Sequence, residues 1–169
     1  MRPRRSTREG GSPEAVKTPV APKVLAVRWL ARREYSRSEL TQRLRQRGVA
    51  AEEIERVLDD LSAAGYLSDA RYAQAVVAQR AGRFGKRAIV YALKERGIGA
   101  ADVQTSLAPL AETDELADAQ ALWQRRFGAA PANDREKARQ VRFLQARGYS
   151  LSTALRVLRA AGSGEGTDL

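Results

Sequence analysis

Cysteine and histidine are both absent from the 169 residues of this chain. Without them the sequence has no disulfide framework, no zinc site of the ordinary ligand types, no haem ligation by those residues and no nucleophile activated by imidazole. Aromatic residues make up only 6%, and the β-branched, aromatic-rich runs typical of a sheet protein are missing. These absences exclude a hydrolase built on imidazole and favour a helical protein, for which we expect no metal and no cofactor.

Long apolar runs are also missing. No stretch approaches the roughly 18 consecutive apolar residues of a membrane span, and the first residues lack the apolar core of a signal peptide. We therefore expect a cytoplasmic protein with no membrane contact. Its length is near that of one typical domain, which is enough to bury a core.

Basic residues, by contrast, are abundant. The 30 basic and 20 acidic residues give a formal net charge of +10, and only five of the basic residues are lysine, so 25 are arginine. Arginine makes planar, bidentate contacts with phosphate and with carboxylate. Charge alone therefore leaves two classes of partner open, namely polyanions and acidic protein surfaces.

A short signature, Leu-x-x-Arg-Gly, occurs three times, and its glycines Gly48, Gly97 and Gly148 are 49 and 51 residues apart. Regular spacing of this kind is typical of a repeat protein. The flanks keep the same register, with one apolar residue directly after each glycine, another at six residues and a leucine at ten. These positions are Val49, Ile98 and Tyr149; Ile54, Val103 and Ala154; and Leu58, Leu107 and Leu158.

Apolar residues three or four apart on both sides of each glycine predict two helices per repeat. The glycine suits the left-handed position that ends a helix, and the arginine before it would meet the negative end of the helix dipole. A further apolar-periodic segment precedes each pair, over residues 23–33, 69–81 and 114–127. Each repeat is therefore a unit of three helices.

Helix start signals agree with this interpretation. Ser36 with Glu39 predicts a capping box, Ser68 precedes the first helix of the second unit, and Asn133 precedes a helix of the third. Pro109 is expected at the frayed end of another helix.

The predicted fold is all-α, with three tandem three-helix repeats in an elongated, curved, solenoid-like arrangement. We assign a disordered basic arm to residues 1–22 and a disordered tail to residues 162–169. The three repeats occupy residues 24–65, 66–111 and 112–161.

The sequence contains no convincing catalytic or nucleotide-binding motif. The loop at residues 82–87 has only two residues between its glycines and no Ser or Thr after its lysine, so it is not a Walker loop. The paired carboxylates at 52–53 and 59–60 are expected on a solvated helix face. Four aromatic side chains at helical spacing are expected to pack in cores; they are Trp29, Tyr72, Trp123 and Phe143.

The positive charge is concentrated in two places. Residues 1–23 and the second repeat each carry a net charge of +4, whereas residues 24–65 and residues 112–169 each carry +1. Within the second repeat, six basic residues stand against one acidic residue between positions 80 and 96, and two glycines there allow close approach of a partner. This predicts a basic patch that binds the partner, made of Arg80, Arg83, Lys86, Arg87, Lys94 and Arg96.

Several runs of residues resemble the RecX family of bacterial regulators of the RecA recombinase, over about residues 24–161. They are residues 35–40 leading into Leu44, residues 57–61 followed by 65–73, and residues 80–85 leading to 93–98. The resemblance implies a non-enzymatic protein that binds along the groove of RecA filaments on DNA. There it would inhibit recombinase, co-protease and ATPase activity in recombination, DNA repair and the SOS response.

Two other functions stay open on the residues alone. A stand-alone nucleic-acid-binding protein would neutralise phosphates with the arm and the second repeat, and its affinity for bare DNA would fall steeply with salt. A helical peptide-binding scaffold would instead show an apolar concave groove. Weak, salt-dependent binding to single- or double-stranded DNA is expected both of a RecA regulator and of a stand-alone nucleic-acid-binding protein. Nothing in the sequence requires more than a monomer.

Overall fold

The computed structural model describes residues 20–111 and 114–163. These residues form nine α-helices, a short 3₁₀ helix and their connections, and they contain no strand. The helices are α1 (Pro22–Leu30), α2 (Arg37–Gln46), α3 (Ala51–Ala63), α4 (Asp69–Arg80), α5 (Lys86–Glu95), α6 (Ala100–Leu107), η1 (Ala108–Ala111), α7 (Glu115–Arg126), α8 (Asp134–Ala146) and α9 (Leu151–Ser163).

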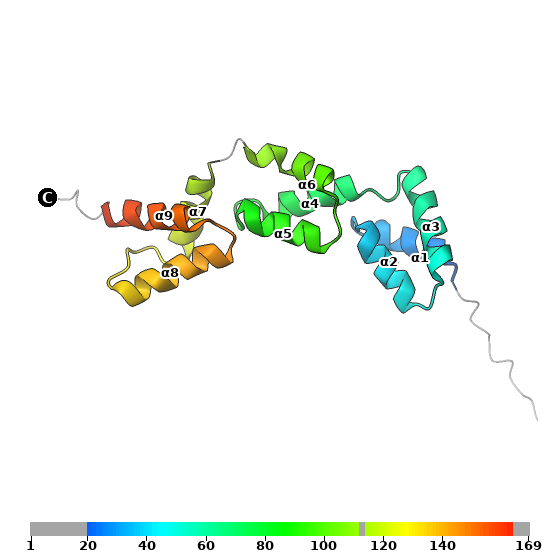
Figure 1. Cartoon of the computed structure of the whole chain (residues 1–169), viewed down its shortest axis with the longest axis horizontal. Coiled ribbons are helices and arrows are strands. Elements are labelled where there is room, and N and C mark those ends of the chain that lie inside the picture. The colour runs from blue at the N-terminus through cyan, green and yellow to red at the C-terminus, as the bar shows by residue number, and fades with distance from the viewer. Residues whose placement is uncertain (1–19, 112–113, 164–169) are drawn as a thin grey trace, which may run out of the picture.

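The helices form three units that lie in a row (Figure 1). Unit one is α1–α3, unit two is α4–α6 with η1, and unit three is α7–α9. Each unit encloses its own cluster of buried apolar side chains, and the most closely packed helix pairs all belong to the same unit. The predicted all-α fold of three tandem three-helix repeats is confirmed.

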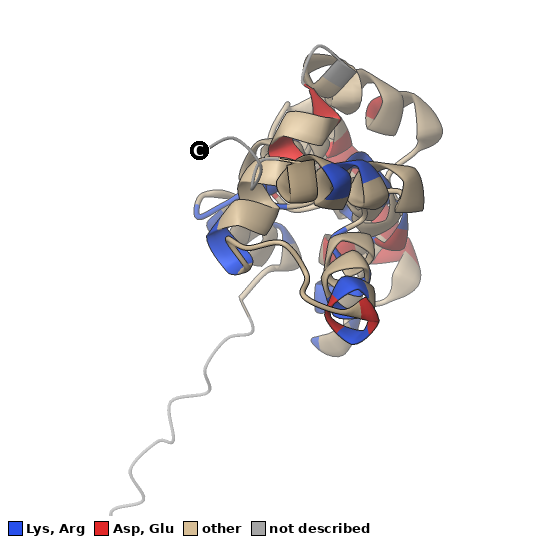
Figure 2. Ribbon diagram, turned by 90° about the vertical axis from the view of Figure 1, so that its left-hand side faces the viewer, with Lys and Arg blue, Asp and Glu red and all other residues tan. Residues whose placement is uncertain are grey.

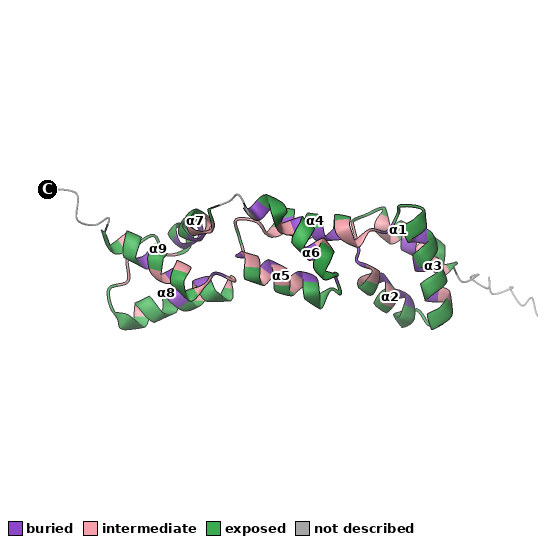
Figure 3. Ribbon diagram, turned by 45° about the horizontal axis from the view of Figure 1, so that its top comes forward, coloured by how far each residue is buried: buried purple, intermediate pink, exposed green. Residues whose placement is uncertain are grey.

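The second helix of each unit lies along the same edge of the row. In the views of Figure 1 and Figure 3, α2, α5 and α8 follow one another along one side of the row, and α3 crosses the outer end of unit one. Figure 3 also shows buried segments turned toward the inside of each unit. Neighbouring units therefore meet mainly through the ends of their helices.

The repeated leucine anchors each core. Leu44, Leu93 and Leu144 are fully buried, each in a different cluster. The apolar residues predicted on either side of the signature are buried or half-buried in the same clusters. Because each Leu lies in the last turn of the second helix, next to the turn into the third, it packs against both.

The glycine of the signature closes the second helix in a left-handed conformation, as predicted. Its φ is +79° at Gly48, +73° at Gly97 and +90° at Gly148. At Gly48 the following residue donates from Val49 N to Leu44 O at 3.2 Å, and the glycine itself donates to Arg45 O at 2.9 Å. This is a Schellman motif, and the same pair of hydrogen bonds recurs in the other two units.

Side-chain caps begin the predicted helices. Ser36 and Glu39 form a capping box on α2, Ser68 Oγ accepts from Arg71 N at the start of α4, and Asn133 caps α8. These bonds satisfy backbone N–H groups that the first helical turn leaves without an internal partner.

A few boundaries differ from those expected. Helix α1 ends at Leu30 rather than residue 33, and Pro109 lies inside the 3₁₀ helix η1 rather than in a frayed end. Pro22 opens α1 at a position where proline needs no N–H, and α9 continues to Ser163. The rest of the predicted arm and tail, residues 1–19 and 164–169, lies outside the described residues.

The four aromatic residues expected to pack do so to different degrees. Tyr72 and Trp123 are buried, and Trp123 Nε1 donates to Gln140 Oε1 at 2.8 Å inside unit three. Trp29 and Phe143 are half-buried, and each ring carries an arginine guanidinium over it. All four therefore support their own unit.

Candidate binding surface

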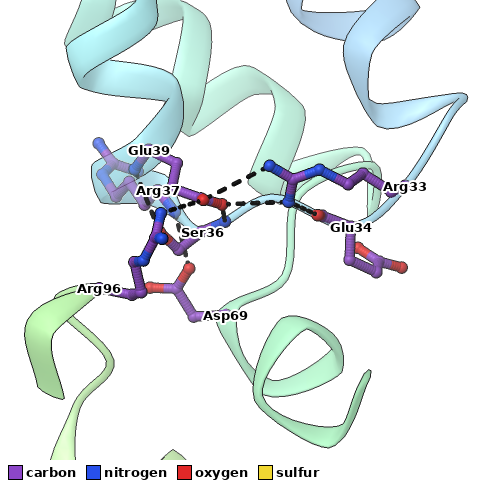
Figure 4. Close-up of polar contacts among 7 residues, drawn as sticks. All are labelled: Arg33, Glu34, Ser36, Arg37, Glu39, Asp69 and Arg96. Atoms are coloured by element: carbon purple, nitrogen blue, oxygen red, sulfur yellow. Dashed lines mark hydrogen bonds and ion pairs between the residues drawn. The ribbon is translucent and has the colours of Figure 1, made fainter. Parts of the chain in front are cut away.

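Glu39 joins unit one to unit two. Its carboxylate accepts from Ser36 N at 3.2 Å as part of the capping box, from Arg33 at 3.4 Å and from Arg96 Nη1 of unit two at 2.6 Å (Figure 4). Its side chain is only 12% exposed. One carboxylate thus caps α2 and holds the next unit against it.

A second set of contacts crosses the same junction. Asp69, the first residue of α4, accepts from Arg37 N at the start of α2 at 2.8 Å (Figure 4), where the positive end of the helix favours a carboxylate. Arg71 donates to Glu34 Oε1 at 2.9 Å and to the carbonyl oxygen of Gly65 at 2.9 Å. The junction between units one and two is therefore held mainly by charged groups.

The junction between units two and three is held by backbone contact. Gly85 N donates to Arg147 O at 2.8 Å. A Cβ on Gly85 would lie 2.7 Å from Gly148 O, and a Cβ on Gly148 would lie 2.5 Å from Ala88 Cβ. The Arg147 guanidinium lies 5.2 Å from the centre of the Phe84 ring. Glycine at both positions allows these two backbone segments to touch.

Tyr149 lies beside this contact and is 2% exposed. No described residue makes a hydrogen bond with its hydroxyl. The pKa of Tyr149 is raised to about 12. Burial is the main cause, and the nearby carboxylates of Asp118 and Glu115 add to it. The group therefore stays neutral at physiological pH.

Both junctions use the same part of the repeat. The Arg96–Gly97 turn of unit two packs on the start of α2, where a Cβ on Gly97 would lie 3.1 Å from Ser38 Cβ. The Arg147–Gly148 turn of unit three packs on the start of α5 in the same way. The sequence predicted that these residues end helices and that Arg96 also belongs to the basic patch, whereas the structure shows that both turns join their unit to the one before it.

Two adjoining hollows, of about 490 and 680 Å³, form an arginine groove over α4 and α5. They share Arg80, Ala92 and Arg96 in their linings. One hollow extends to unit one at Glu34 and the other to unit three at Tyr149. The groove therefore crosses all three units, and no single repeat contains it.

The charges in the groove are only partly paired. Glu39 is bonded to Arg33 and Arg96, and Glu34 is bonded to Arg71. Arg80 lies over the Phe84 ring at 5.2 Å, and among the described residues neither Arg80 nor Arg87 pairs with a carboxylate. These two arginines are the cations that the groove leaves available for a partner.

The six residues of the predicted basic patch do not lie together. Arg80, Arg87 and Arg96 line the groove. Lys86 lines a separate small hollow with Glu115 and Asp118 of unit three. The two remaining side chains, those of Arg83 and Lys94, are exposed and line neither hollow of the groove. Figure 2 likewise shows acidic segments interleaved with basic ones.

Sequence reasoning missed two residues of the groove. Arg33 lies in unit one, outside the charge-rich stretch, and Tyr91 is 67% exposed on α5 between two arginines. An exposed aromatic side chain one helical turn after Arg87 is a signal that the sequence contained, because residues four apart share a helix face. The position of Arg33 depends on how units one and two are joined.

Other kinds of site are not found in the part of the chain that the structure describes. None of its helices is long and apolar enough to cross a membrane. Residues 20–111 and 114–163 likewise hold no cluster of three or more side chains of the acidic, histidine and cysteine types that bind metals.

Family models match each of the three units in turn. The model of the first three-helix domain of RecX matches residues 23–61, that of the second matches residues 68–107 and that of the third matches residues 112–158. The order of the domains is the order of the units along the row. The chain belongs to the RecX family.

Relatives support this over most of the sequence. The chain is 48% identical over 136 residues to the regulatory protein RecX of Leptothrix cholodnii, with 80% of this chain and 86% of the relative covered. It is 43% identical over 152 residues to RecX of Pseudomonas savastanoi pv. phaseolicola, with 89% and 97% covered. The predicted family is confirmed, and with it the role of a non-enzymatic regulatory protein that acts on RecA.

Solved RecX structures share the fold. The crystal structure of RecX from Lactobacillus salivarius superposes with a TM-score of 0.66 at 17% identity and covers 83% of this chain and 94% of that one. A second crystal structure, of a regulatory protein RecX, gives a TM-score of 0.67 at 21% identity and covers 80% and 71%. At this identity the likeness concerns the arrangement of the three units.

Proposed function

We propose that this RecX chain restrains RecA by laying its arginine groove along a nucleoprotein filament, with Arg80 and Arg87 as the central contacts. The observation that carries the proposal is that the groove crosses all three units and has its unpaired cations in the middle. A filament is long and repetitive, and an elongated row of units suits it. A RecA filament on DNA offers both phosphates and acidic side chains to arginine.

The three basic residues outside the groove have smaller roles in this proposal. Lys86 lines a small hollow together with Glu115 and Asp118 of its own chain, so its charge lies in a mixed environment rather than in the groove. Arg83 and Lys94 add a general attraction that salt would screen. Arg96 lines the groove but is also bonded to Glu39, and it keeps unit one in position.

Units one and three supply the restraint. While unit two holds the filament through Arg80 and Arg87, the flanking units would contact neighbouring RecA protomers. A bridge of this kind blocks the relative movement of protomers that turnover requires, or favours their release. In this proposal the length of the row matters as much as its charge.

The test is a double charge reversal in the groove, Arg80→Glu with Arg87→Glu, compared with Arg156→Glu with Arg159→Glu on the exposed face of α9. Both variants change the net charge equally. Each charge-assisted contact contributes about 1.5–3 kcal/mol. We therefore expect the groove variant to need at least about tenfold more protein for half-maximal inhibition of RecA ATPase on single-stranded DNA.

The α9 variant should inhibit like the unaltered chain. Thermal unfolding of both variants shows whether they fold, and Arg80→Ala with Arg87→Ala provides a milder version. Equal inhibition by the groove and α9 variants, when both are folded, would refute the role of the groove.

Binding to bare DNA is the competing activity, and the same variants distinguish it. Sedimentation with RecA-coated and with bare single-stranded DNA, each at low and raised salt, compares the two ligands. Affinity that comes from phosphate contacts alone falls steeply with salt. We expect co-sedimentation with the filament to persist at a salt concentration that abolishes binding to bare DNA.

An apolar peptide is a poorer match for the groove. Such ligands bind through apolar anchors in an apolar cleft. The centre of this groove is occupied by arginines, and its most exposed ring, Tyr91, lies among them.

A further inference from the structure

The same inter-unit contact is made twice within the chain. Arg96 and Gly97 pack on the start of α2, and Arg147 and Gly148 pack on the start of α5. In each case the Arg-Gly turn that ends the second helix of one unit meets the first turn of the second helix in the preceding unit. A row built by this rule leaves one half of the contact unused at each end.

The unused turn is Arg47–Gly48, at the end of the second helix of unit one. Arg47 is exposed, and its guanidinium lies 5.9 Å from the Trp29 ring without a carboxylate partner among the described residues. Nothing described lies within 4 Å of the position that a Cβ on Gly48 would take. This turn has the same Schellman geometry as the two that are packed.

The unused acceptor is the first turn of α8, in unit three. Asn133 Oδ1 accepts from Glu136 N at 3.0 Å, and Glu136 Oε2 accepts from Ala132 N at 2.9 Å. Glu136 stands three residues after the cap of α8, as Glu39 stands three residues after the cap of α2. Glu136 is therefore the equivalent, at the free end of the row, of Glu39, the residue that binds Arg96 inside the chain.

A hollow of about 430 Å³ marks the same place on α8. It is lined by Glu136 and by three arginines of the helix. The corresponding hollow beside α2 has Gly97 and Asp69 of unit two in its lining. The two hollows thus show the acceptor with and without a following unit.

Charges on the two ends are complementary. Glu52 and Glu53 lie in the first turn of α3, directly after the Arg47–Gly48 turn. If this turn packs on α8, these carboxylates approach the arginines that surround Glu136, while Arg47 approaches Glu136 itself. The arginines of that hollow are Arg135, Arg139 and Arg142.

We propose that a second copy of this chain docks here, so that Arg47–Gly48 of one copy packs on the first turn of α8 of the other and Arg47 pairs with Glu136. Figure 1 places α2 and α8 in the two outer units, at opposite ends of the row. The contact is therefore heterologous, and repeating it continues the row as an open string.

The contact between copies is weaker than those inside the chain. No covalent link holds the two units together, and the position that Asp69 occupies in α4 is Pro22 in α1, which offers no carboxylate. The monomer expected from the sequence is the dilute form of this equilibrium. Association rises with concentration, or when copies lie in line on one elongated partner.

Sedimentation velocity of the full chain, over a range of concentrations and without any partner, tests the proposal. We expect the weight-average sedimentation coefficient of the unaltered chain to rise with concentration. Arg47→Glu alone and Glu136→Arg alone each place like charges together, and each should lower the association constant at least about tenfold. Arg156→Glu, on exposed α9, should associate like the unaltered chain.

An equimolar mixture of the two single variants is the decisive arm. The glutamate introduced at position 47 of one variant can then meet the arginine introduced at position 136 of the other. The unaltered Arg47 and Glu136 can still pair with each other between the two variants, so association should return to the level of the unaltered chain. Restored association supports the contact even if either variant is less stable alone. An unaltered chain that stays monomeric at about 0.5 mM, or a mixture that behaves like its separate components, overturns it.

Discussion

Arg96 and Glu39 lie 57 residues apart in the sequence and form a 2.6 Å ion pair that joins unit one to unit two. Glu39 is at the same time the carboxylate of the capping box that begins α2 with Ser36. Folding of the second helix and attachment of the next unit therefore depend on one carboxylate, and the two effects can be separated by substitution.

A double-mutant cycle of Glu39→Ala and Arg96→Ala is expected to show a coupling of about 1 kcal/mol in the free energy of unfolding. The coupling should be small because the Arg96 side chain is 54% exposed and is therefore well solvated. It should be above zero because the Glu39 side chain is only 12% exposed. Urea unfolding of the four proteins measures it. In 1 M NaCl the coupling should fall, because salt screens an exposed charge.

Glu136→Ala is the matched control for the cap. It removes a carboxylate at the equivalent position of α8, where no arginine of another described unit binds. Glu39→Ala and Glu136→Ala should each lower the free energy of unfolding by about 1 kcal/mol through loss of the cap. If Arg96→Ala lowers the free energy of unfolding by the same amount in the presence and in the absence of Glu39, the ion pair contributes nothing to the junction.

Gly85→Ala is expected to destabilise the chain, whereas Gly99→Ala is not. Both glycines are N-cap residues, of α5 and α6, and neither has a positive φ. A Cβ at Gly85 would lie 2.7 Å from the Gly148 carbonyl oxygen, whereas nothing described lies within 4 Å at Gly99. Overpacking of this kind costs about 1–3 kcal/mol, and thermal unfolding of the two variants compares them directly.

The clash at Gly85 should also act on the junction. Limited proteolysis between units two and three is expected to become faster in Gly85→Ala and to stay unchanged in Gly99→Ala. Equal stability and equal proteolysis of the two variants would contradict a close backbone contact at this junction.

The helices could be predicted because each is specified by residues close to one another. The Leu-x-x-Arg-Gly signature contains a buried leucine, a helix end and a left-handed glycine within five residues, and Ser36 with Glu39 specifies a helix start within four. Local patterns of this size leave little choice of conformation. They also recur, so that each unit supports the interpretation of the others.

The groove could not be predicted in this way. Its lining comes from all three units, and Arg33 enters it only because Glu39 and Asp69 fix the position of unit two. Arg96 was counted in the basic patch, but its charge is partly balanced by a carboxylate 57 residues away. A helix end already explained each Arg-Gly turn, so nothing in the local sequence indicated its second role.

Tyr149→Phe is expected to leave the stability unchanged or raised at pH 7 and to reduce the loss of stability at high pH. The hydroxyl is buried without a bond to any described residue, so its removal costs little. Burial raises the pKa of Tyr149 to about 12, against about 10 for tyrosine in an unfolded chain. The folded protein therefore holds this proton more tightly than the unfolded protein does.

The sign of the pH effect follows from that difference. Below pH 10 the Tyr149 hydroxyl is protonated in both states, so its titration does not lower the free energy of unfolding. As the pH rises from 10 to 12, the unfolded chain loses this proton and the folded chain keeps it, which lowers the free energy of unfolding by about 3 kcal/mol in total. Urea unfolding between pH 9 and pH 12 should therefore show a shallower decline for Tyr149→Phe than for the unaltered chain. Tyr91→Phe, which changes an exposed ring, is the control and should follow the unaltered chain. Parallel profiles for Tyr149→Phe and the unaltered chain above pH 10 would show that the Tyr149 hydroxyl titrates in the folded protein as it does in the unfolded one.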